Sequence, residues 1–267
     1  MKRNGTLLFL IGLFLLQPGT DLSGCTLFGA VGSGVEGGGV LIGKTRDRPE
    51  SLEQVFVIQK PEGRFQYRGI CTKGKAVTSG INEKGLIIVN AAASHIEGRE
   101  KKATSPGKIL SRASSVEEVI EMLRKGKILG PIFYLVGDRQ QIALIEVAEK
   151  GRYAIEVKKN GILFHTNHFI FKELTRYNPK VGKGSSARLQ RIEQLLSKDP
   201  FTREGFIAFT KDHENGPGDR SICRHFEKDV HSSERTISAA VYYLPKEGPP
   251  EVWVSLGQPC QSIFEKY

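Results

Sequence analysis

The segment that decides the fold is LSGCTLFGAVGSGVEGGGVLIGKTRD, residues 22–47. It contains two apolar runs, residues 26–31 and 40–45, separated by the glycine-rich segment GSGVEGGG. Two short apolar runs joined by a glycine-rich turn predict a β-hairpin. A hairpin returns the end of its second strand to the start of its first. We therefore expect Asp47 to lie beside Cys25.

Three fates are open to Cys25: a lipid anchor, half of a disulfide, or the N-terminal residue of the working protein. The tetrapeptide LSGC, residues 22–25, resembles the cleavage box of bacterial lipoproteins, in which the cysteine is acylated. Lipidation and an N-terminal catalytic role exclude each other, because both use the same sulfur and the same amine. Two features count against the lipoprotein. Polar residues 17–21 separate the box from the apolar run, and an apolar strand rather than a polar tether follows it.

The N-terminus has the layout of a secretory signal peptide. A short basic region, residues 1–4, precedes the apolar run LLFLIGLFLL, residues 7–16, and small and polar residues follow. This order predicts a signal peptide over residues 1–24, removed to leave one domain over residues 25–267. The expected location is outside the cytoplasm, in the periplasm, the extracellular medium or at the cell surface.

The composition of the 267 residues limits the classes of partner that the protein is expected to bind. The net charge is +10, but lysine and arginine are scattered without a basic block or interleaved aromatic residues, so nucleic acid is not expected. No apolar stretch of roughly 18 residues follows the N-terminus, so the mature chain is not expected to span a membrane. A catalytic Cys25 leaves three cysteines, whose pairing stays open, and the oligomeric state also stays open. These three cysteines are Cys71, Cys223 and Cys260.

The rest of the chain predicts strands in runs with helices grouped between them. Further strands are expected over residues 54–59, 64–69, 76–79, 86–92, 132–136, 142–147, 153–157, 162–165, 237–244 and 251–256. Helices are expected over residues 116–125, capped by Ser115; over 186–197, capped by Ser185 or Ser186; and, more weakly, over 203–211. This order favours an α+β layered domain over a parallel doubly wound one.

An N-terminal Cys25 would carry its own base. A free α-amine has a pKa of about 7.7–8.0, so part of it is neutral near physiological pH and can take the thiol proton. Such a site needs a carboxylate to hold the amine and polar donors for the oxyanion of the tetrahedral intermediate. Asp47 is the candidate carboxylate. Asn90 and Asn167 end apolar strands and are the candidate donors.

Six segments together resemble the N-terminal-nucleophile hydrolases of the isopenicillin N acyltransferase and choloylglycine hydrolase type. They occur in family order and cover nearly all of residues 25–267. The segments are CTLFGAVGSGVEGGGVLIGKTRD, GINEKGL, LFHTNHF, SSARLQRIEQLL, DHENGPGDRSICRH and WVSLGQPC. The resemblance implies a four-layer αββα sandwich with two stacked antiparallel sheets flanked by helices. It also implies cleavage of linear, non-peptide amides, or acyl transfer.

The resemblance also implies roles for single residues. Cys25 is expected to be the nucleophile and its own amine the base. Asp47 is expected to orient that amine, and Asn167 to contribute to the oxyanion hole. Arg188, in SSARLQR, matches a position that supports the site.

The chain departs from the choloylglycine type at two places. That type has Arg-Asn-x-Asp where this chain has Lys44-Thr45-Arg46-Asp47. The aspartate is kept, and Lys44 and Arg46 become candidates for substrate binding, although a lysine is not equivalent to an arginine fork. Asn90 lies two residues earlier than its counterpart, counted from the Gly-Leu pair, and stays a candidate catalytic residue.

Asn82 and the histidines are interpreted as structural. Asn82 stands in a predicted turn. His165, His168, His213 and His225, with Cys223, could bind zinc, but catalytic zinc usually uses a helical spacing such as HExxH, and HTNH ends a strand. We expect neither a metal nor a cofactor.

The sequence thus predicts an exported N-terminal-cysteine amidohydrolase or acyltransferase that forms an acyl-enzyme on Cys25. The expected partners are a small acyl amide and, for transfer, an acceptor amine. Bile salts, penicillins, N-acyl amino acids, and peptidoglycan or signalling amides all stay open as substrates. Who cuts Gly24–Cys25, the protein itself or a signal peptidase, stays open too. The alternative is a lipid-anchored surface binding protein without catalysis.

Overall fold

The computed structural model of the chain describes residues 24–94, 96, 103–225 and 234–267. Nearly all of the predicted signal peptide, residues 1–24, therefore lies outside the described residues, and only its last residue, Gly24, is placed. The described strands form two antiparallel sheets, one of six strands and one of seven.

The six-stranded sheet carries the predicted N-terminal hairpin. Its strand order is β10-β1-β2-β11-β12-β13, so the first and last described strands and one from the middle of the chain meet in one sheet. Cys25 pairs with Arg46 across the hairpin. The strands are β1 (Cys25–Val31), β2 (Val40–Pro49), β10 (Gly161–His165), β11 (Glu234–Leu244), β12 (Glu251–Ser255) and β13 (Glu265–Lys266).

The seven-stranded sheet follows the order of the chain, so each strand pairs with the next in sequence. In this meander the connection between β6 and β7, residues 93–131, is long, and the other connections are short. The strands are β3 (Gln54–Gln59), β4 (Tyr67–Thr72), β5 (Ser79–Asn82), β6 (Ile87–Ala92), β7 (Ile132–Gly137), β8 (Ile142–Val147) and β9 (Tyr153–Lys158).

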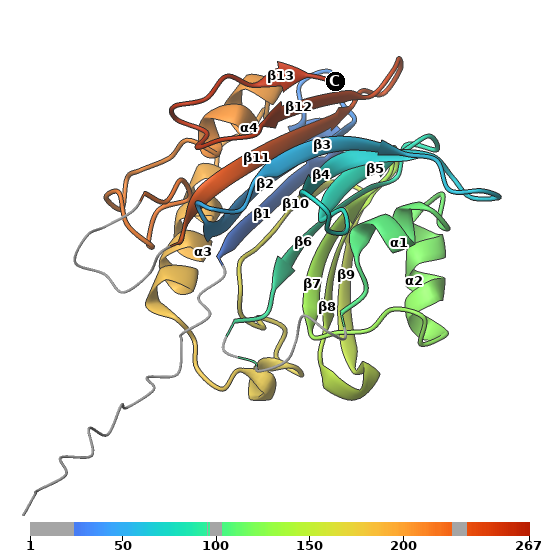
Figure 1. Cartoon of the computed structure of the whole chain (residues 1–267), viewed down its shortest axis with the longest axis horizontal. Coiled ribbons are helices and arrows are strands. Elements are labelled where there is room, and N and C mark those ends of the chain that lie inside the picture. The colour runs from blue at the N-terminus through green and yellow to red at the C-terminus, as the bar shows by residue number, and fades with distance from the viewer. Residues whose placement is uncertain (1–23, 95, 97–102, 226–233) are drawn as a thin grey trace, which may run out of the picture.

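The helices cover the outer face of each sheet. In Figure 1, α1 (Pro106–Leu110) and α2 (Val116–Arg124) lie beside the seven-stranded sheet, whereas α3 (Lys183–Leu195) and α4 (Arg203–Phe209) lie beside the six-stranded one. Short 3-10 turns occupy Gly32–Gly34, Glu149–Gly151 and Thr175–Tyr177.

Three apolar clusters match the three interfaces between four layers. One cluster joins inward-facing residues of both sheets, such as Leu27 and Leu135. A second joins the seven-stranded sheet to α1 and α2, and a third joins the six-stranded sheet to α3 and α4. The predicted four-layer αββα sandwich is thereby confirmed.

Local differences from the prediction have local causes. Strand β4 begins three residues later than expected, because Arg64 closes a turn with the carbonyl of Pro61. Strand β5 is shifted likewise, because the carbonyl of Val77 accepts from Gly107 of α1, a helix that was not predicted.

Of the predicted helix N-caps, the one at α2 is confirmed and the one at α3 is not. Ser115 caps α2 as expected, accepting from Glu118 N. The predicted serine caps of α3 are wrong: the helix begins earlier, after an extended Gly182, and Ser185 lies inside it. The Ser185 hydroxyl instead accepts from Asn167 N at 3.0 Å and so supports the site.

Candidate active site

Cys25 opens β1, and its side chain is only 1% exposed. It pairs with Arg46, and Leu27 pairs with Lys44. Directly paired residues point to the same face of an antiparallel sheet, and neighbours along a strand point to opposite faces. The Cys25 thiol therefore shares the face toward the second sheet with Lys44 and Arg46. Asp47 lies on the opposite face, toward α3.

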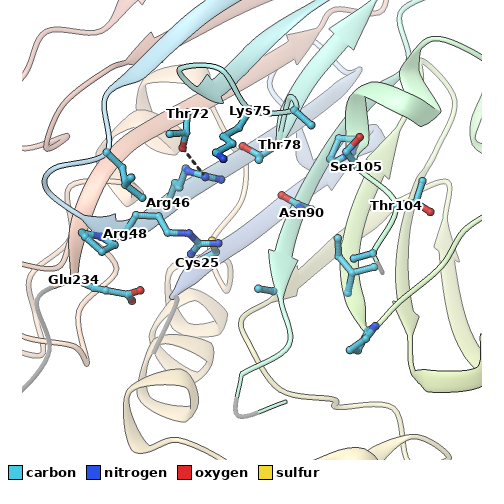
Figure 2. A pocket seen from close by; sticks show the side chains of 18 residues that line it. Cys25, Arg46, Arg48, Thr72, Lys75, Thr78, Asn90, Thr104, Ser105 and Glu234 are labelled. Carbon is cyan, nitrogen blue, oxygen red and sulfur yellow. Dashed lines mark hydrogen bonds between the residues drawn. The ribbon is translucent and has the colours of Figure 1, made fainter. Parts of the chain in front are cut away.

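Cys25 lines a cavity of about 470 Å³ between the two sheets. Figure 2 shows Arg46, Arg48 and Lys75 grouped near Cys25, with Asn90 across from them. The cavity walls also include apolar side chains. These are Pro49, Leu52, Ala76, Ala92, Ala103, Pro106, Pro131 and Ile132.

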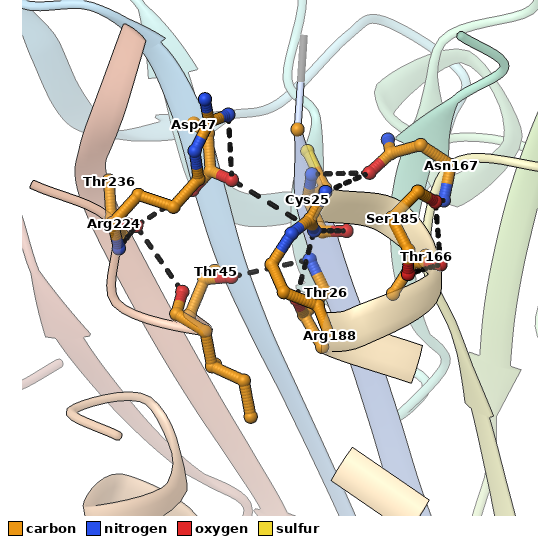
Figure 3. A network of polar contacts seen from close by, with 12 residues as sticks. Cys25, Thr26, Thr45, Asp47, Thr166, Asn167, Ser185, Arg188, Arg224 and Thr236 are labelled. Carbon is orange, nitrogen blue, oxygen red and sulfur yellow. Dashed lines mark hydrogen bonds and ion pairs between the residues drawn. The ribbon is translucent and has the colours of Figure 1, made fainter. Parts of the chain in front are cut away.

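The Gly24–Cys25 peptide bond is held on both sides, as Figure 3 shows in part. The Gly24 carbonyl accepts from Asp47 N at 2.9 Å, and Gly24 N donates to Glu234 Oε2 at 3.3 Å. Cys25 N donates to Asn167 Oδ1 at 2.9 Å, and the Cys25 carbonyl accepts from Arg188 Nη1 at 2.8 Å. This bond is therefore fixed in place by polar groups from four distant segments.

Asp47 is fully buried beside this bond. Its Oδ1 accepts from Thr236 Oγ1 at 2.7 Å, and its Oδ2 lies 3.5 Å from Arg224 Nη1 and 4.0 Å from Arg188 Nη1. Two guanidinium groups offset the cost of burying a carboxylate. The carboxylate and the cations form one network behind β1 (Figure 3).

Arg188, a residue of α3, connects this helix to β1. Besides the Cys25 carbonyl, it donates to Thr26 Oγ1 at 3.2 Å and to Asn167 Oδ1 at 3.0 Å. Burial lowers its pKa, while Asp47 acts in the opposite direction. The predicted supporting position of Arg188 thus corresponds to a buried residue that contacts Cys25 directly.

Asn167 follows β10 and is only 1% exposed. Its Oδ1 faces Cys25 N and Arg188, while its Nδ2 donates to the carbonyl of Ala92 at 2.9 Å. The side chain therefore presents its oxygen, not its nitrogen, to the Cys25 nitrogen.

Asn90 lines the cavity and is linked to Lys44. Lys44 Nζ donates to Asn90 Oδ1 at 2.8 Å and to the carbonyl of Thr78 at 3.1 Å. Burial lowers the pKa of Lys44 to about 7, with Arg46 adding to this and Cys25 opposing it. Lys44 thus contacts two cavity residues, whereas Arg46 lines the cavity itself and donates to Thr72 Oγ1 at 3.1 Å.

Arg224 and Glu234 complete the network and were not predicted. Arg224 Nη1 lies 3.4 Å from Glu234 Oε2, which also accepts from Gly24. Burial raises the pKa of Glu234 to about 7, against the effect of Arg48 and Arg224. Arg224 belongs to the segment DHENGPGDRSICRH, whose resemblance to the family was the one sign in the sequence that it could take part in the site. Glu234 had no local signal, because its role depends on pairing between distant strands.

The structural interpretation of Asn82 is confirmed. Its Oδ1 accepts from Lys84 N and Leu86 N, and its Nδ2 donates to Leu110 O and Ala113 O. The side chain thus shapes the turn and ties it to the region of α1.

The histidines discussed above do not form one cluster: His165 and His168 lie near the end of β10, and His213 and His225 lie elsewhere. His165 Nε2 pairs with the buried Glu146 at 2.8 Å, and His168 Nδ1 contacts Ser185 Oγ at 2.7 Å. Burial lowers the pKa of His168 to about 4, with His165 and Arg188 acting in the same direction. His213 and His225 lie together elsewhere, in the connection that follows α4.

Two comparisons place the chain among known proteins. The fold is that of the N-terminal-nucleophile hydrolases. A family model described as acyl-coenzyme A:6-aminopenicillanic acid acyl-transferase matches residues 35–261. The chain belongs to that family, an enzyme family of amide hydrolases and acyltransferases. A search among curated proteins finds no significant match.

Solved structures show the same fold. Penicillin V acylase from Agrobacterium tumefaciens is 14% identical, with a TM-score of 0.56, covering 87% of this chain and 83% of that one. An N-acylethanolamine-hydrolyzing acid amidase ortholog from Caenorhabditis elegans is 14% identical, with a TM-score of 0.56 and coverages of 91% and 99%. A variant of conjugated bile acid hydrolase from Clostridium perfringens is 15% identical, with a TM-score of 0.53 and coverages of 90% and 96%.

None of the helices in the described part of the chain has the length and apolar character needed to cross a membrane.

Proposed function

We propose that the exported protein is cut at Gly24–Cys25 and that Cys25 then hydrolyses a linear, non-peptide amide, or transfers its acyl group, through a thioester. The observation that carries the proposal is the opposite orientation of two groups on Cys25. Its thiol faces a cavity, while its backbone nitrogen is held at 2.9 Å from Asn167 Oδ1, within a network that contains Asp47.

The proposed reaction uses the α-amine as the only proton carrier. The neutral amine of Cys25 takes the proton of its own thiol, and the thiolate attacks the amide carbonyl carbon. The tetrahedral intermediate collapses when the protonated α-amine gives that proton to the leaving nitrogen, which leaves a thioester on Cys25 and a neutral α-amine. Water, or an acceptor amine, then attacks the thioester and loses a proton to the α-amine. The acid or new amide leaves, and the thiol is restored.

Asn90 and Asn167 receive different roles in this proposal. Asn90 lines the same cavity as Cys25, and its Oδ1 is occupied by Lys44, so its Nδ2 is the end that can donate to an oxyanion. Asn167 Nδ2 is bound to the Ala92 carbonyl, so we assign Asn167 to holding the α-amine through Oδ1. Asp47 and Arg188 orient the same strand end.

The cavity favours an amide that is partly apolar and negatively charged. Arg46, Arg48 and Lys75 place positive charge beside Cys25, and Glu234 is the carboxylate among the lining residues. The apolar walls offer contact to a hydrocarbon portion. Penicillin V and conjugated bile acids, the substrates in the names of two solved relatives, agree with a site of this kind.

The lipid-anchored alternative is not favoured. Cys25 is 1% exposed, and it opens a strand paired on both edges, with β2 and β10. Acyl chains on its sulfur would have to fill the space between the two sheets. Membership in an enzyme family also favours catalysis.

A panel of acyl donors tests the function. Matched pairs of amides with and without a carboxylate are offered to the processed protein, and intact-mass spectrometry follows the enzyme during turnover. We expect an acyl increment on the peptide that contains Cys25, faster turnover of the charged donors, and no turnover by Cys25→Ala. Full activity in Cys25→Ala would end the proposal.

N-terminal sequencing of the secreted protein tests the processing. We expect an unmodified Cys25 as the first residue, because acylating its amine or leaving it in a peptide bond removes the basic lone pair. If Cys25→Ala is still cut after Gly24, a signal peptidase makes the cut; if not, the thiol does. A diacylglyceryl increment on Cys25, or full activity of an unprocessed chain, would contradict the proposal.

A further inference from the structure

Four side chains with metal-binding atoms converge outside the cavity. His213 follows α4, Cys223 and His225 precede β11, and Cys260 follows β12. One ligand atom of each lies within 4.8 Å of all the others. His225 Nε2 is 2.7 Å from His213 Nε2 and 3.3 Å from Cys260 Sγ. The connection after α4 and the segment after β12 thus bring two imidazoles and two thiols to one point.

We propose that His213, Cys223, His225 and Cys260 bind a structural zinc ion. Two thiolates and two imidazoles are a complete tetrahedral set for Zn²⁺, with bonds of about 2.3 Å to sulfur and 2.0–2.1 Å to nitrogen. In such a tetrahedron the ligand atoms are separated by about 3.3–3.8 Å. The observed spread is close enough that small side-chain rotations complete the site. Binding releases the two thiol protons to solvent.

The contacts within the cluster are those that a cation would satisfy. The two imidazole nitrogens lie 2.7 Å apart, so at most one proton fits between them and at least one nitrogen offers a lone pair. The same His225 nitrogen also faces the Cys260 sulfur. A metal ion at the centre accepts all these lone pairs at once. The set contains no carboxylate, and nitrogen with sulfur selects zinc over magnesium or calcium.

Backbone hydrogen bonds hold two of the four ligand residues. Cys223 N donates to Asp212 O at 3.1 Å, and His225 N donates to Pro217 O at 2.6 Å. The ligand spacing, with Cys260 far downstream, does not follow the paired patterns of common zinc modules, so the sequence did not indicate that Cys260 joins His213, Cys223 and His225. The earlier expectation of no zinc grouped these histidines with His165 and His168, which the structure places elsewhere.

The site would hold Arg224 in place. Cys223 and His225 flank Arg224, whose Nη1 lies 3.5 Å from Asp47 Oδ2. Arg224 N donates to Thr236 Oγ1, and its carbonyl accepts from Gln258 Nε2, two residues before Cys260. A zinc ion would therefore fix the segment that delivers Arg224 to the buried carboxylate. Zinc would act as a structural ion that positions this residue, without contact to the substrate.

Metal content of the full processed chain is the first test, and it does not depend on activity. The protein is produced in the presence of zinc and dialysed, and its zinc content is measured by elemental mass spectrometry. We expect about one zinc per chain, and near-complete loss in Cys260→Ser and His213→Gln. Cys71→Ser and His168→Gln are matched controls that should keep the metal, because neither residue belongs to the cluster.

Cobalt is the second probe. Replacing zinc by Co²⁺ should give the intense visible bands of tetrahedral coordination and a thiolate charge-transfer band, both lost in Cys260→Ser. Zinc should also raise the melting temperature of the wild type and not of that variant. A native Cys223–Cys260 disulfide, or a wild type that retains no metal after dialysis, would overturn the proposal.

The link to Arg224 has its own readout. Removing zinc with a chelator should lower kcat at least tenfold with little change in KM, because Arg224 contacts Asp47 and is not among the residues lining the cavity. Unchanged kcat with the metal gone would remove the positioning role. A protein that binds zinc but cleaves no amide would contradict the proposed function without contradicting the zinc site.

Discussion

Asn167 Oδ1 lies 2.9 Å from the backbone nitrogen of Cys25, although 142 residues separate the two in sequence. The same oxygen accepts from Arg188 at 3.0 Å, so its position is fixed from α3 as well as from β10. A new α-amine at Cys25 would find this acceptor already in place. Pre-organised partners of this kind avoid reorganisation during the reaction.

Asp47→Asn should lower kcat by at least about 100-fold while the protein stays folded. The reason is that a neutral amide cannot balance the positive charges of Arg188 and Arg224, which lie near the Cys25 amine. Steady-state kinetics and circular dichroism measure both effects. The exposed Asp199→Asn variant is the control and should behave as wild type. Normal kinetics in a folded Asp47→Asn protein would remove Asp47 from the mechanism.

Asn90→Ala should lower kcat by about 10²–10³-fold with KM nearly unchanged, which is the usual cost of losing one oxyanion donor. The reason is the position of Asn90 on the cavity wall shared with Cys25. A change confined to KM would show that Asn90 binds substrate in the ground state and that the oxyanion is held elsewhere.

Asn167→Ala should also reduce kcat, by roughly 100-fold, because it releases both the Cys25 nitrogen and Arg188 and misplaces the base. The rate of acylation, followed in a single turnover, isolates this step. If acylation keeps its rate and substrate affinity alone falls, Asn167 is a binding residue.

Gly24→Val should stop maturation. A Cβ at residue 24 would lie 2.3 Å from Asp47 Oδ2 and 2.7 Å from Arg224 Nη1, so either these buried side chains or the Gly24–Cys25 bond would have to shift. Intact-mass measurement should show the uncut chain and no activity. Gly34→Ala is the control, since its Cβ meets only ordinary contacts from 3.7 Å. Normal processing of Gly24→Val would show that this close packing is not needed for the cut.

Lys44→Met should flatten the pH dependence of stability. Burial lowers the pKa of Lys44 to about 7 from 10.5, so between these values the unfolded chain binds more protons. The free energy of unfolding should therefore rise with pH across this window, by on the order of a few kcal/mol. Denaturant titrations at several pH values measure it. The exposed Lys198→Met should keep the slope, and a Lys44→Met protein that also keeps it would refute the assignment.

The parts of the fold that local patterns control could be predicted from the sequence. The glycine-rich reversal placed Asp47 next to the start of β1, and Asp47 N does bond to the Gly24 carbonyl. Ser115 capped its helix as predicted. Strand β4 was misplaced because the turn at Pro61 extends further than its composition showed.

The long-range parts of the site could not be predicted. Glu234 reaches Gly24 through the pairing of β11 with β2, and Arg224 reaches Asp47 from the segment before β11, which is bonded to Thr236 and Gln258. Nothing in the spacing of residues 47, 224 and 234 reveals these contacts. Asn167 was named as a donor, but whether its oxygen or its nitrogen faces Cys25 depends on Ala92 and Arg188, from two other elements.

The alternation of side chains along β2 constrains how the length of this chain can vary in evolution. Lys44 reaches Asn90 of the second sheet, while Asp47 reaches Thr236 and the arginines on the other face. Inserting or deleting one residue within β2 would exchange the two faces of the strand. The Lys44 amine would then point away from the second sheet, and the Asp47 carboxylate would point toward it. Length changes in related chains should therefore collect in the Gly32–Gly39 reversal, where register can be restored before Val40.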